Sequence, residues 1–594
     1  MFSVLLGLRI PSARIKILQV IPYSSRLIMA ETPSHSPVWI YDTTLRDGAQ
    51  REGLSLSLED KIRIAQQLDH LGMPFIEGGW PGANPKDVQF FWQVREQHPL
   101  KQSQLVAFCS TRRPQRKAAD DQLLQAILAA GTHWVTLFGK SWDLHVTEGL
   151  KTSLEENVAM IADSIQYLRS QQRRVIYDAE HWFDGYKQNP DYALKTLEAA
   201  LEAGAEWIVL CDTNGGTLPH ELGAIVAAVN EAFHFATEIP SIADPLSTPG
   251  LGIHTHNDSE TAVANAIAAV MGGARMVQGT MNGYGERCGN ANLCSLIPNL
   301  QLKLGFSCLT SEQLTHLTPS SRLISEIANL APNDHAAYVG LSAFAHKGGI
   351  HVSAVAKNPL TYEHITPDQV GNTRRIVVSD QAGLSNILAK AHSWGLELDK
   401  QDPLCRQLLD RLKTLENQGY QFESAEASFE LLMREAMGNR PQFFELLDFQ
   451  VHCVTRTQGE INPGMDAWAT VKIKVNGEEV LAAGEGNGPV SALDAALRKA
   501  LLKGYPQVEQ FHLTDYKVRI LDGTTGTAAR TRVLIEVSNG QQRWITLGVS
   551  TNIIEASYQA LVEAIEYGLL LDSEAGKASA TAAESLQRDK LASR

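Results

Sequence analysis

Between residues 37 and about 305, a short apolar run that ends in small or polar residues is followed by a helical stretch, and this pattern occurs eight times. The apolar runs occupy residues 38–48, 74–79, 105–110, 133–139, 174–182, 207–216, 251–258 and 274–285. Eight alternations match a closed (β/α)8 barrel, which typically takes about 250 residues. A doubly wound open sheet is the alternative, but it would more often carry GxGxxG at the first strand–helix turn, where this chain has RDGAQ. The sequence therefore predicts an α/β fold with a TIM barrel over residues 36–305.

Residues 306–440 follow the predicted barrel and look helical and rich in loops. Within them, residues 337–371 are dense in His, Gly and Tyr, which suits a loop placed over a site better than a core helix. We therefore predict a helical linker with lid subdomains over residues 306–440.

An internal repeat occupies residues 441–572. Two strand patterns and a helix occur twice, and Asn476-Gly477 and Asn539-Gly540 favour a hairpin in each copy. Gly484 and Gly548 precede the two helices at equal offsets. A duplication of about 64 residues predicts a pseudo-symmetric, two-lobed α+β domain.

The two ends of the chain are predicted to lack a packed core. Residues 1–35 form a flexible extension, in which the stretch before Met29 carries four basic residues and no acid. This stretch is either a weak transit peptide or sequence upstream of a true start at Met29, and Pro11 and Pro22 favour the second interpretation because they interrupt any amphipathic helix. Residues 573–594, rich in Ala, Ser and charge, are predicted to be a disordered tail.

Composition restricts the partners and the compartment. A net charge of -14 argues against nucleic acid and anionic membranes as partners. No apolar run approaches the ~20 residues of a membrane span. Seven cysteines without a CxxC fit neither a disulfide framework nor a zinc–thiolate site, and they favour a reducing compartment. We expect a cytoplasmic protein, or one of the plastid stroma if residues 1–28 are a transit peptide.

Polar residues gather at the predicted strand ends. In a TIM barrel all strand carboxyl ends face one mouth, where catalysis takes place. The residues at those ends are Arg46, Asp47, Glu77, Glu180, Asp212, Asn214, His254, His256, Asn257 and Glu286. The sequence therefore predicts a polar site at the mouth of an otherwise apolar barrel.

Two histidines in the seventh apolar run point to a metal. His254 and His256 are two residues apart in a strand, so both imidazoles project from the same face. Asp47 would be a near neighbour across the closed barrel, and Asn290 could add an amide oxygen. This donor set suits Mg²⁺, Mn²⁺, Co²⁺ or Zn²⁺ with open positions. The alternative is that the histidines only make hydrogen bonds in a polar mouth.

Arg46 and Glu180 are the candidate catalytic groups beside this site. Arg46, next to a metal-bound Asp47, could stabilise an oxyanion on a carbonyl, or it could simply neutralise carboxylates. Glu180 ends the fifth run and could hold or abstract a proton, or it could be an ordinary helix-start carboxylate. The glycine-rich segment 282–290 could cradle a phosphate or carboxylate through its backbone amides.

The segments DTTLRDGAQ (42–50), GIHTHND (252–258) and GTMNGYGERCGNANL (279–293) resemble the 2-isopropylmalate synthase, homocitrate synthase and citramalate synthase family, which are metal-dependent TIM-barrel Claisen condensers. The resemblance covers residues 37–570. IEGGWPGANPKD (76–87) and DAEHWFDGYKQNP (178–190) look most like the citramalate synthase branch.

The resemblance implies roles for matching residues. It implies metal ligation by Asp47, His254, His256 and Asn290, and catalysis by Arg46, Glu180, His351 and Tyr362. It implies substrate binding by Arg46, Gln50, Glu77 and Thr217. His351 and Tyr362 match residues that family members place over the site of a partner subunit, which implies a homodimer.

The reaction implied is the condensation of acetyl-CoA with pyruvate and hydrolysis of the thioester, giving (R)-citramalate and CoA. It would open a threonine-independent route to isoleucine, with isoleucine rather than leucine as the effector of the C-terminal domain. His181 departs from the family pattern and bears on which 2-oxo acid fits. The rival functions are a 2-isopropylmalate synthase, a hydroxymethylglutaryl-CoA-lyase-like enzyme and, outside enzymes, an amino-acid sensor.

Overall fold

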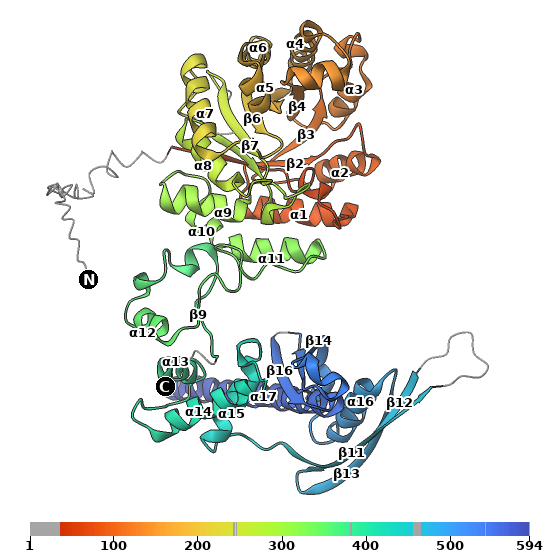
Figure 1. Ribbon diagram of the computed structural model, residues 1–594, viewed down its shortest axis with the longest axis vertical. Helices are drawn as coiled ribbons and strands as arrows, with labels where there is room; N and C mark the ends of the chain where they lie inside the picture. The colour runs from red at the N-terminus through yellow and green to blue at the C-terminus, as the bar shows by residue number, and fades with distance from the viewer. Residues whose placement is uncertain are drawn as a thin grey trace, which may run out of the picture. The chain divides into compact units, whose positions relative to one another are not determined.

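The computed structural model describes residues 36–240, 244, 246–379, 383–455, 465–540 and 542–592 (Figure 1). The predictions made for residues 1–35 lie outside this part of the chain. The described chain forms two compact units. The first reaches Phe344 and takes in Ile365–Thr373, and the second consists of Ala345–His364 and the chain from Arg374 onward.

The first unit is built on a closed barrel of eight parallel strands, each bonded to its neighbours in sequence, with β8 closing on β1. The strands are β1 (Trp39–Asp42), β2 (Phe75–Gly79), β3 (Gln104–Ser110), β4 (Trp134–Lys140), β5 (Arg174–Glu180), β6 (Trp207–Asp212), β7 (Gly250–Thr255) and β8 (Met276–Gly279). The predicted TIM barrel is confirmed, and the doubly wound sheet is excluded.

Helices cover the outside of the barrel (Figure 1). They are α1 (Leu58–Leu71), α2 (Pro85–Glu96), α3 (Gln122–Ala129), α4 (Leu154–Ser170), α5 (Trp182–Gln188), α6 (Pro190–Glu202), α7 (Pro219–Phe233), α8 (Ala262–Met271) and α9 (Leu293–Pro298). Helix α1 shows why the boundaries fall where they do. Ser57 caps its first turn in a reciprocal capping box with Asp60, and Gly72 ends it in the left-handed region at φ 83°.

Aromatic rings close the amino-terminal end of the barrel. Trp39, Phe75, Trp134 and Trp207 are each the first residue of a strand and are almost fully buried. The Trp39 ring centroid lies 5.4 Å from that of Phe75 and 5.2 Å from that of Trp207. Because this end is filled by side chains, a cavity in the barrel can open only at the carboxyl ends of the strands.

Both units share the segment predicted as a linker. Helices α10 (Ser311–Leu314) and α11 (Leu317–Ile327) belong to the first unit, where α11 contacts α1. From Ala345 the chain pairs the two-residue strands β9 (Ala345–His346) and β10 (Arg375–Ile376) within the second unit. The second unit also holds α12 (Gly349–Lys357), α13 (Leu384–Ser393), α14 (Pro403–Asn417) and α15 (Glu426–Ala436).

The C-terminal domain has the repeat that the sequence predicted. The first copy is β11 (Phe444–Thr455), β12 (Met465–Val475), β13 (Glu478–Gly486) and α16 (Pro489–Leu501). The second is β14 (His512–Ile520), β15 (Thr531–Ser538), β16 (Arg543–Ser550) and α17 (Ile553–Ala592). Each copy is a three-stranded antiparallel sheet packed on its helix, with one register shift near the start of its first strand.

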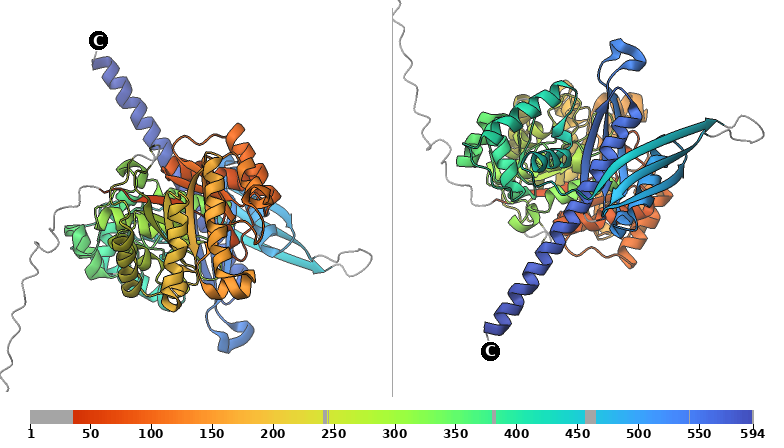
Figure 2. Two further views of the ribbon diagram at one scale, coloured as in Figure 1. Left: turned by 90° about the horizontal axis from the view of Figure 1, so that it is seen from above. Right: turned by 90° about the horizontal axis from the view of Figure 1, so that it is seen from below.

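The predicted disordered tail is wrong for most of its length. Helix α17 continues as one helix to Ala592 (Figure 2). The segment contains six alanines, the residue with the highest helix propensity, and no proline, so an established helix is readily extended through it.

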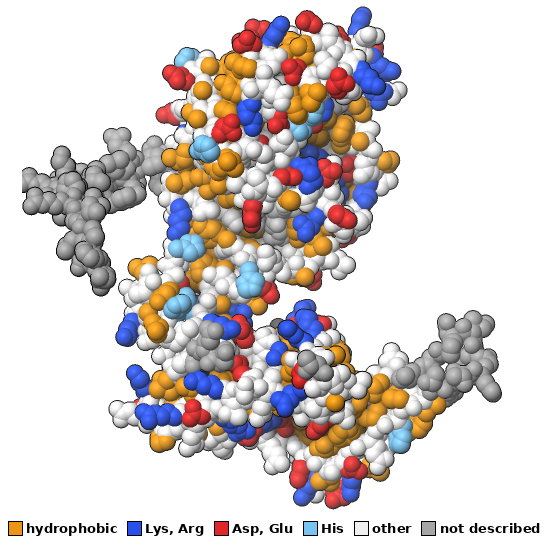
Figure 3. All heavy atoms as spheres, viewed as in Figure 1, with side chains coloured by type: hydrophobic (Ala, Val, Ile, Leu, Met, Phe, Trp, Pro, Cys, Tyr) orange, Lys and Arg blue, Asp and Glu red, His pale blue; other side chains and the backbone are white. Residues whose placement is uncertain are grey.

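Charge and hydropathy of the described chain show two further features. No helix in the described residues has the length and apolar character needed to cross a membrane. On the face shown in Figure 3, lysines and arginines are interspersed with acidic side chains, so positive charge is not concentrated there.

Candidate active site at the barrel mouth

A cavity of about 260 Å³ opens at the carboxyl ends of the barrel strands. Charged residues that follow β1 or lie at the end of β5 line one part of it, and the two histidines of the β7 segment line another. The rings of Trp80, Phe108 and Phe138 form an apolar wall, in which the two phenylalanines stack at 5.2 Å. The cavity is small, and it joins a charged end to an aromatic one.

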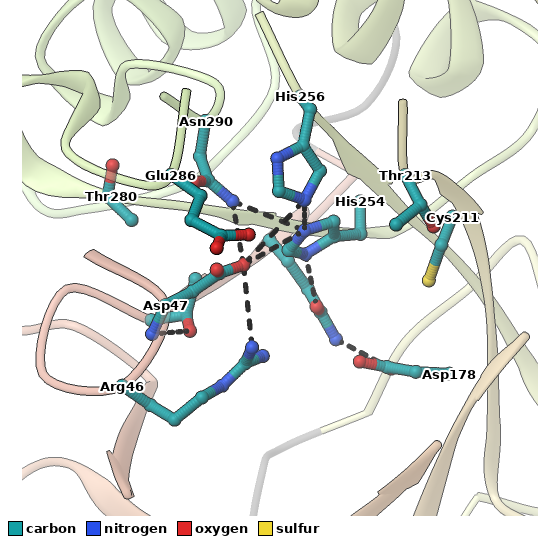
Figure 4. A network of polar contacts seen from close by, with 12 residues as sticks. Arg46, Asp47, Asp178, Cys211, Thr213, His254, His256, Thr280, Glu286 and Asn290 are labelled. Carbon is teal, nitrogen blue, oxygen red and sulfur yellow. Dashed lines mark hydrogen bonds and ion pairs between the residues drawn. The ribbon is translucent and has the colours of Figure 1, made fainter. Parts of the chain in front are cut away.

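Asp47, His254 and His256 converge at the charged end (Figure 4). One ligand atom from each lies within 4.8 Å of the others, and all three residues are buried. The Nε2 atoms of the histidines are 3.1 Å apart, and Asp47 Oδ2 lies 3.3 Å from His254 Nε2 and 3.9 Å from His256 Nε2. Three donors aimed at one point are the arrangement that a divalent cation needs.

Strand geometry produces this convergence. His254 is the penultimate residue of β7, and His256 follows the strand end, where its backbone bridges to Asn290. Thr255 points the other way and bonds to Ala262 of α8. Asp47 comes from the loop after β1, and strand β8 alone separates β7 from β1.

Asn290 completes the group. Its Nδ2 lies 2.9 Å from Asp47 Oδ2 and 3.2 Å from His254 Nε2, while its buried Oδ1 has no hydrogen-bond partner among the described residues. A rotation of this amide by 180° would aim Oδ1 at the ligand atoms of Asp47 and His254. The orphaned oxygen and the donor set together fit a bound cation.

The glycine-rich loop before Asn290 is shaped by close packing. Gly285 has a φ of 152°, and a Cβ there would lie 1.9 Å from Asn290 Oδ1. Gly289 has a φ of 90°, and its Cβ would lie 2.0 Å from the carbonyl oxygen of Gly283. These glycines therefore let the loop fold tightly around Asn290. The prediction that its amides cradle an anion is not tested.

Charges around the site favour the forms that bind a cation. Burial by itself would raise the pKa of Asp47, but the Arg46 guanidinium and His254 lower it well below its usual range. Burial and neighbouring His254 lower the pKa of His256 to about 3. Burial would also lower the pKa of His254, but Asp47 raises it above its usual value. Asp47 is thus held as an anion and His256 as a neutral imidazole, which are the forms that bind a cation.

Arg46 is held rigidly beside the cavity. Its Nε donates to Glu77 Oε2 at 2.8 Å, its Nη1 lies 3.5 Å from Asp47 Oδ2, and its guanidinium stacks on Phe108 at 3.8 Å. These contacts fix a permanent cation next to the three convergent ligands.

Glu77 occupies a different place from the one predicted. It is fully buried, bonds to Tyr41, Thr43 and Arg46, and is not part of the cavity wall. The proposed substrate contact is therefore corrected: Glu77 supports Arg46 from behind. It is the middle residue of β2, a strand whose five residues are all buried, and nothing in the sequence distinguishes a supporting carboxylate there from one that contacts substrate.

The remaining predicted residues divide into three groups. Gln50 and Glu180 line the cavity, with Glu180 paired to Lys140. Thr217 does not line it, because its side chain is buried against Asp212 and Lys187, and Thr213 takes the place at the cavity. His351 and Tyr362 lie in the second unit, where their ring centroids are 4.3 Å apart.

Asp178 and Gln278 are polar residues near the ligands that the sequence analysis did not predict. Asp178 lies two residues before Glu180 on β5, so both project into the barrel, and it lines the cavity. Its Oδ1 accepts a hydrogen bond of 2.9 Å from Gln278 Nε2. The alternation on β5 was the available signal, because a carboxylate at an inward position of a buried strand is rare without a function.

Comparisons with known protein families match three successive parts of the chain. Residues 37–324 match the HMGL-like family, residues 338–420 the homocitrate synthase post-HMGL domain-like family and residues 423–569 the LeuA allosteric (dimerisation) domain. The (R)-citramalate synthase of Synechocystis sp. is 67% identical over 534 residues, which are 90% of this chain and 96% of that protein. The chain belongs to the (R)-citramalate synthase family. The enzyme of the same name from Aquifex aeolicus is 53% identical over 91% of this chain and 99% of its own.

A 2-isopropylmalate synthase of Synechococcus sp. is more distant, at 32% identity over 90% of this chain and 95% of its own. The predicted family, its citramalate synthase branch and the acyltransferase class are therefore confirmed. The HMGL-like family is dependent on divalent metals, in agreement with the convergence of Asp47, His254 and His256.

Proposed function

We propose that this chain condenses acetyl-CoA with pyruvate and hydrolyses the thioester, so that acetyl-CoA, pyruvate and water give (R)-citramalate and CoA. The observation that carries the proposal is the buried group of Asp47, His254 and His256 beside Arg46 at the barrel mouth. The high identity to (R)-citramalate synthases supports it.

Asp47, His254 and His256 would hold a divalent ion, with the amide oxygen of Asn290 as a further ligand. Mg²⁺, Mn²⁺, Co²⁺ and Zn²⁺ all accept two imidazoles and carboxylate or amide oxygens. When bound, such an ion supplies Lewis-acid chemistry by polarising the carbonyl group of a 2-oxo acid.

Arg46 binds the 2-oxo acid and stabilises the negative charge that develops on the ketone oxygen during carbon–carbon bond formation. Its guanidinium is fixed by Glu77 and Phe108, so it needs no reorganisation when that charge forms. Gln50, on the same cavity wall, is a further substrate contact.

Glu180 is the candidate group in the barrel that takes a proton from the acetyl methyl group. It lines the cavity and is held by Lys140. His351 and Tyr362 act on the same reaction from a partner subunit, which makes the working enzyme a homodimer. Their mutual contact supports a shared role, and the LeuA allosteric (dimerisation) match supports the oligomer.

The aromatic wall selects the 2-oxo acid. Phe108, Phe138 and Trp80 restrict a cavity of about 260 Å³, which suits the methyl group of pyruvate better than a branched side chain. One methylene is worth about 1–3 kcal/mol in such a pocket, so 2-oxobutyrate is the expected side substrate.

Isoleucine is the proposed feedback effector, bound by the C-terminal domain, and the reaction would begin a threonine-independent route to that amino acid. The match to the LeuA allosteric (dimerisation) domain supports effector binding. Cytoplasmic location stays a prediction.

A CoA-release assay with four 2-oxo acids tests the proposal. Purified chain with acetyl-CoA should release CoA fastest with pyruvate, about ten-fold or more slowly with 2-oxobutyrate, and negligibly with 2-oxoisovalerate or 2-oxoglutarate. The product from pyruvate should be (R)-citramalate on a chiral column. Preference for 2-oxoisovalerate would instead identify a 2-isopropylmalate synthase.

A further inference from the structure

Asp178 is a buried carboxylate that the proposed chemistry does not use. Its side chain projects from β5 into the barrel and is 4% exposed. Its Oδ1 accepts a 2.9 Å hydrogen bond from Gln278 Nε2, which is buried on β8. Figure 4 labels Asp178 and draws this contact as a dashed line. Asp178 therefore reaches the metal-binding group through one intermediate side chain.

Gln278 connects Asp178 to His254. Gln278 and His254 are Cα partners in the parallel register of β7 and β8, so their side chains lie next to each other. His254 Nδ1 lies 2.8 Å from Gln278 Oε1. An amide oxygen only accepts, so His254 must carry its proton on Nδ1. That tautomer leaves the lone pair of Nε2 directed at Asp47 and His256.

The orientation of the Gln278 amide decides the tautomer. If the amide were flipped, its NH2 group would face His254 Nδ1, which would then have to be the unprotonated nitrogen. The proton would move to Nε2, and this nitrogen could no longer bind a cation. Asp178 opposes the flip, because its carboxylate accepts from an NH2 group and cannot form the same bond with an amide oxygen.

We propose that Asp178 is a positioning residue that fixes the Gln278 amide and thereby holds His254 in the tautomer that binds the metal. The inference rests on the proposed metal ligation by Asp47, His254 and His256. Partners of metal-binding histidines outside the ligand set orient the rings and tune their affinity in this manner, and losing one costs about 10–100-fold in metal affinity.

The ionised form of Asp178 is the one that opposes the flip. Burial raises the pKa of Asp178 to about 7, opposed by nearby His254 and reinforced by Glu77. In the ionised form both carboxylate oxygens only accept. A protonated carboxyl group could also donate to the oxygen of a flipped amide, so Co²⁺ affinity is to be measured above neutral pH.

The test is the affinity of the full-length protein for Co²⁺, measured by competition with a chromophoric chelator. Asp178→Ala removes the constraint on Gln278, and we expect Co²⁺ to bind about 10–100-fold more weakly. The double variant Asp178→Ala/Gln278→Glu should bind within about three-fold of the parent, because an ionised glutamate presents only acceptors to His254 Nδ1 and needs no orienting partner.

Glu206→Ala is the matched control. Glu206 is a buried carboxylate at the amino-terminal end of β6, paired with Arg174 and Arg169 and away from the mouth. It should lower the melting temperature and leave Co²⁺ affinity unchanged. If Asp178→Ala does not fold, the near-isosteric Asp178→Asn replaces it. Its amide can face Gln278 with either group, so affinity should still fall about three-fold or more.

Three results would overturn the inference. The first two are parent-level Co²⁺ affinity in folded Asp178→Ala and parent-level Co²⁺ affinity in Asp178→Asn. The third is a double variant that binds Co²⁺ as weakly as Asp178→Ala, because a residue that acts only through packing would not be rescued by a change at residue 278. A parent protein that fails to bind Co²⁺ would instead refute the metal site itself.

Discussion

At the scale of single residues, the site depends on a division of labour between neighbours in sequence. Asp47 faces the histidines, whereas Arg46 faces the cavity and is held by Glu77 and Phe108. Adjacent opposite charges at a strand end are common in solvated loops. Here Asp47 is 4% exposed, and two histidines converge on it. The pair is therefore not a surface ion pair, and its burial beside two histidines supports the proposed metal site.

Arg46→Lys should separate charge from geometry. Lysine keeps the positive charge but cannot bond Glu77 through two nitrogens or stack on Phe108. We expect kcat for CoA release to fall about 10²–10³-fold, the usual cost of losing one donor to a developing oxyanion, while the melting temperature changes little.

Arg95→Lys is the control for Arg46→Lys. Arg95 lies on α2, is roughly half exposed and pairs with Glu96. Its kcat should match that of the parent. A kcat for Arg46→Lys within a few-fold of the parent would contradict the role given to the guanidinium.

At the scale of elements, the sequence predicted best those features that depend on the residues of a single strand or helix. The eight strands, the caps of α1 and the same-face histidines follow from local patterns. Asp178 and Gln278 did not follow, because their contact joins β5 to β8 across the barrel interior and 100 residues of chain. Thr217 was predicted to bind substrate, but the loop after β6 places Thr213 at the cavity instead. The path of that loop cannot be read from the sequence of one strand or helix.

The duplicated domain gives a prediction about packing between a strand and a helix. A Cβ at Gly548 of β16 would lie 2.0 Å from the carbonyl oxygen of Ala556, and one at Gly484 of β13 would lie 2.3 Å from the amide nitrogen of Ala496. Gly548→Ala should therefore destabilise the domain by ~1–3 kcal/mol, the cost of overpacking. Urea unfolding of the full chain measures it.

Gly523→Ala controls for the loss of a glycine, since no described atom lies within 4 Å of a Cβ at Gly523. It should change the free energy of unfolding by a few tenths of a kcal/mol at most. Equal midpoints for Gly548→Ala and the parent would show that the strand and helix can separate freely.

At the scale of the whole molecule, the division into two units was not predictable. It depends on β9 and β10, two strands of two residues each, which bring Ala345–His364 into the second unit. Pairings this short leave no periodic pattern in a sequence. The segment that carries His351 and Tyr362 thus belongs to the unit that also holds the LeuA allosteric (dimerisation) match.

The role proposed for His351 and Tyr362 in a partner subunit's site requires a dimer. We expect light scattering to give a particle of twice the 65.1 kDa chain mass. A fully active monomer would contradict that role.

The identity of the effector is tested by inhibition. Isoleucine should inhibit CoA release by the full chain at lower concentration than leucine. Stronger inhibition by leucine would make leucine the effector.

We expect Asp47, His254 and His256 to hold the divalent ion on which condensation depends. The most direct measurement is the rate of CoA release from acetyl-CoA and pyruvate by chelator-treated protein, before and after Mn²⁺ or Co²⁺ is added back, in the parent and in His254→Ala. The parent should lose activity on chelation and regain it with metal. His254→Ala should stay at least 10²-fold below the parent at every metal concentration and bind the ion more weakly. Parent-level activity of metal-free His254→Ala would show that condensation does not depend on an ion held by these residues.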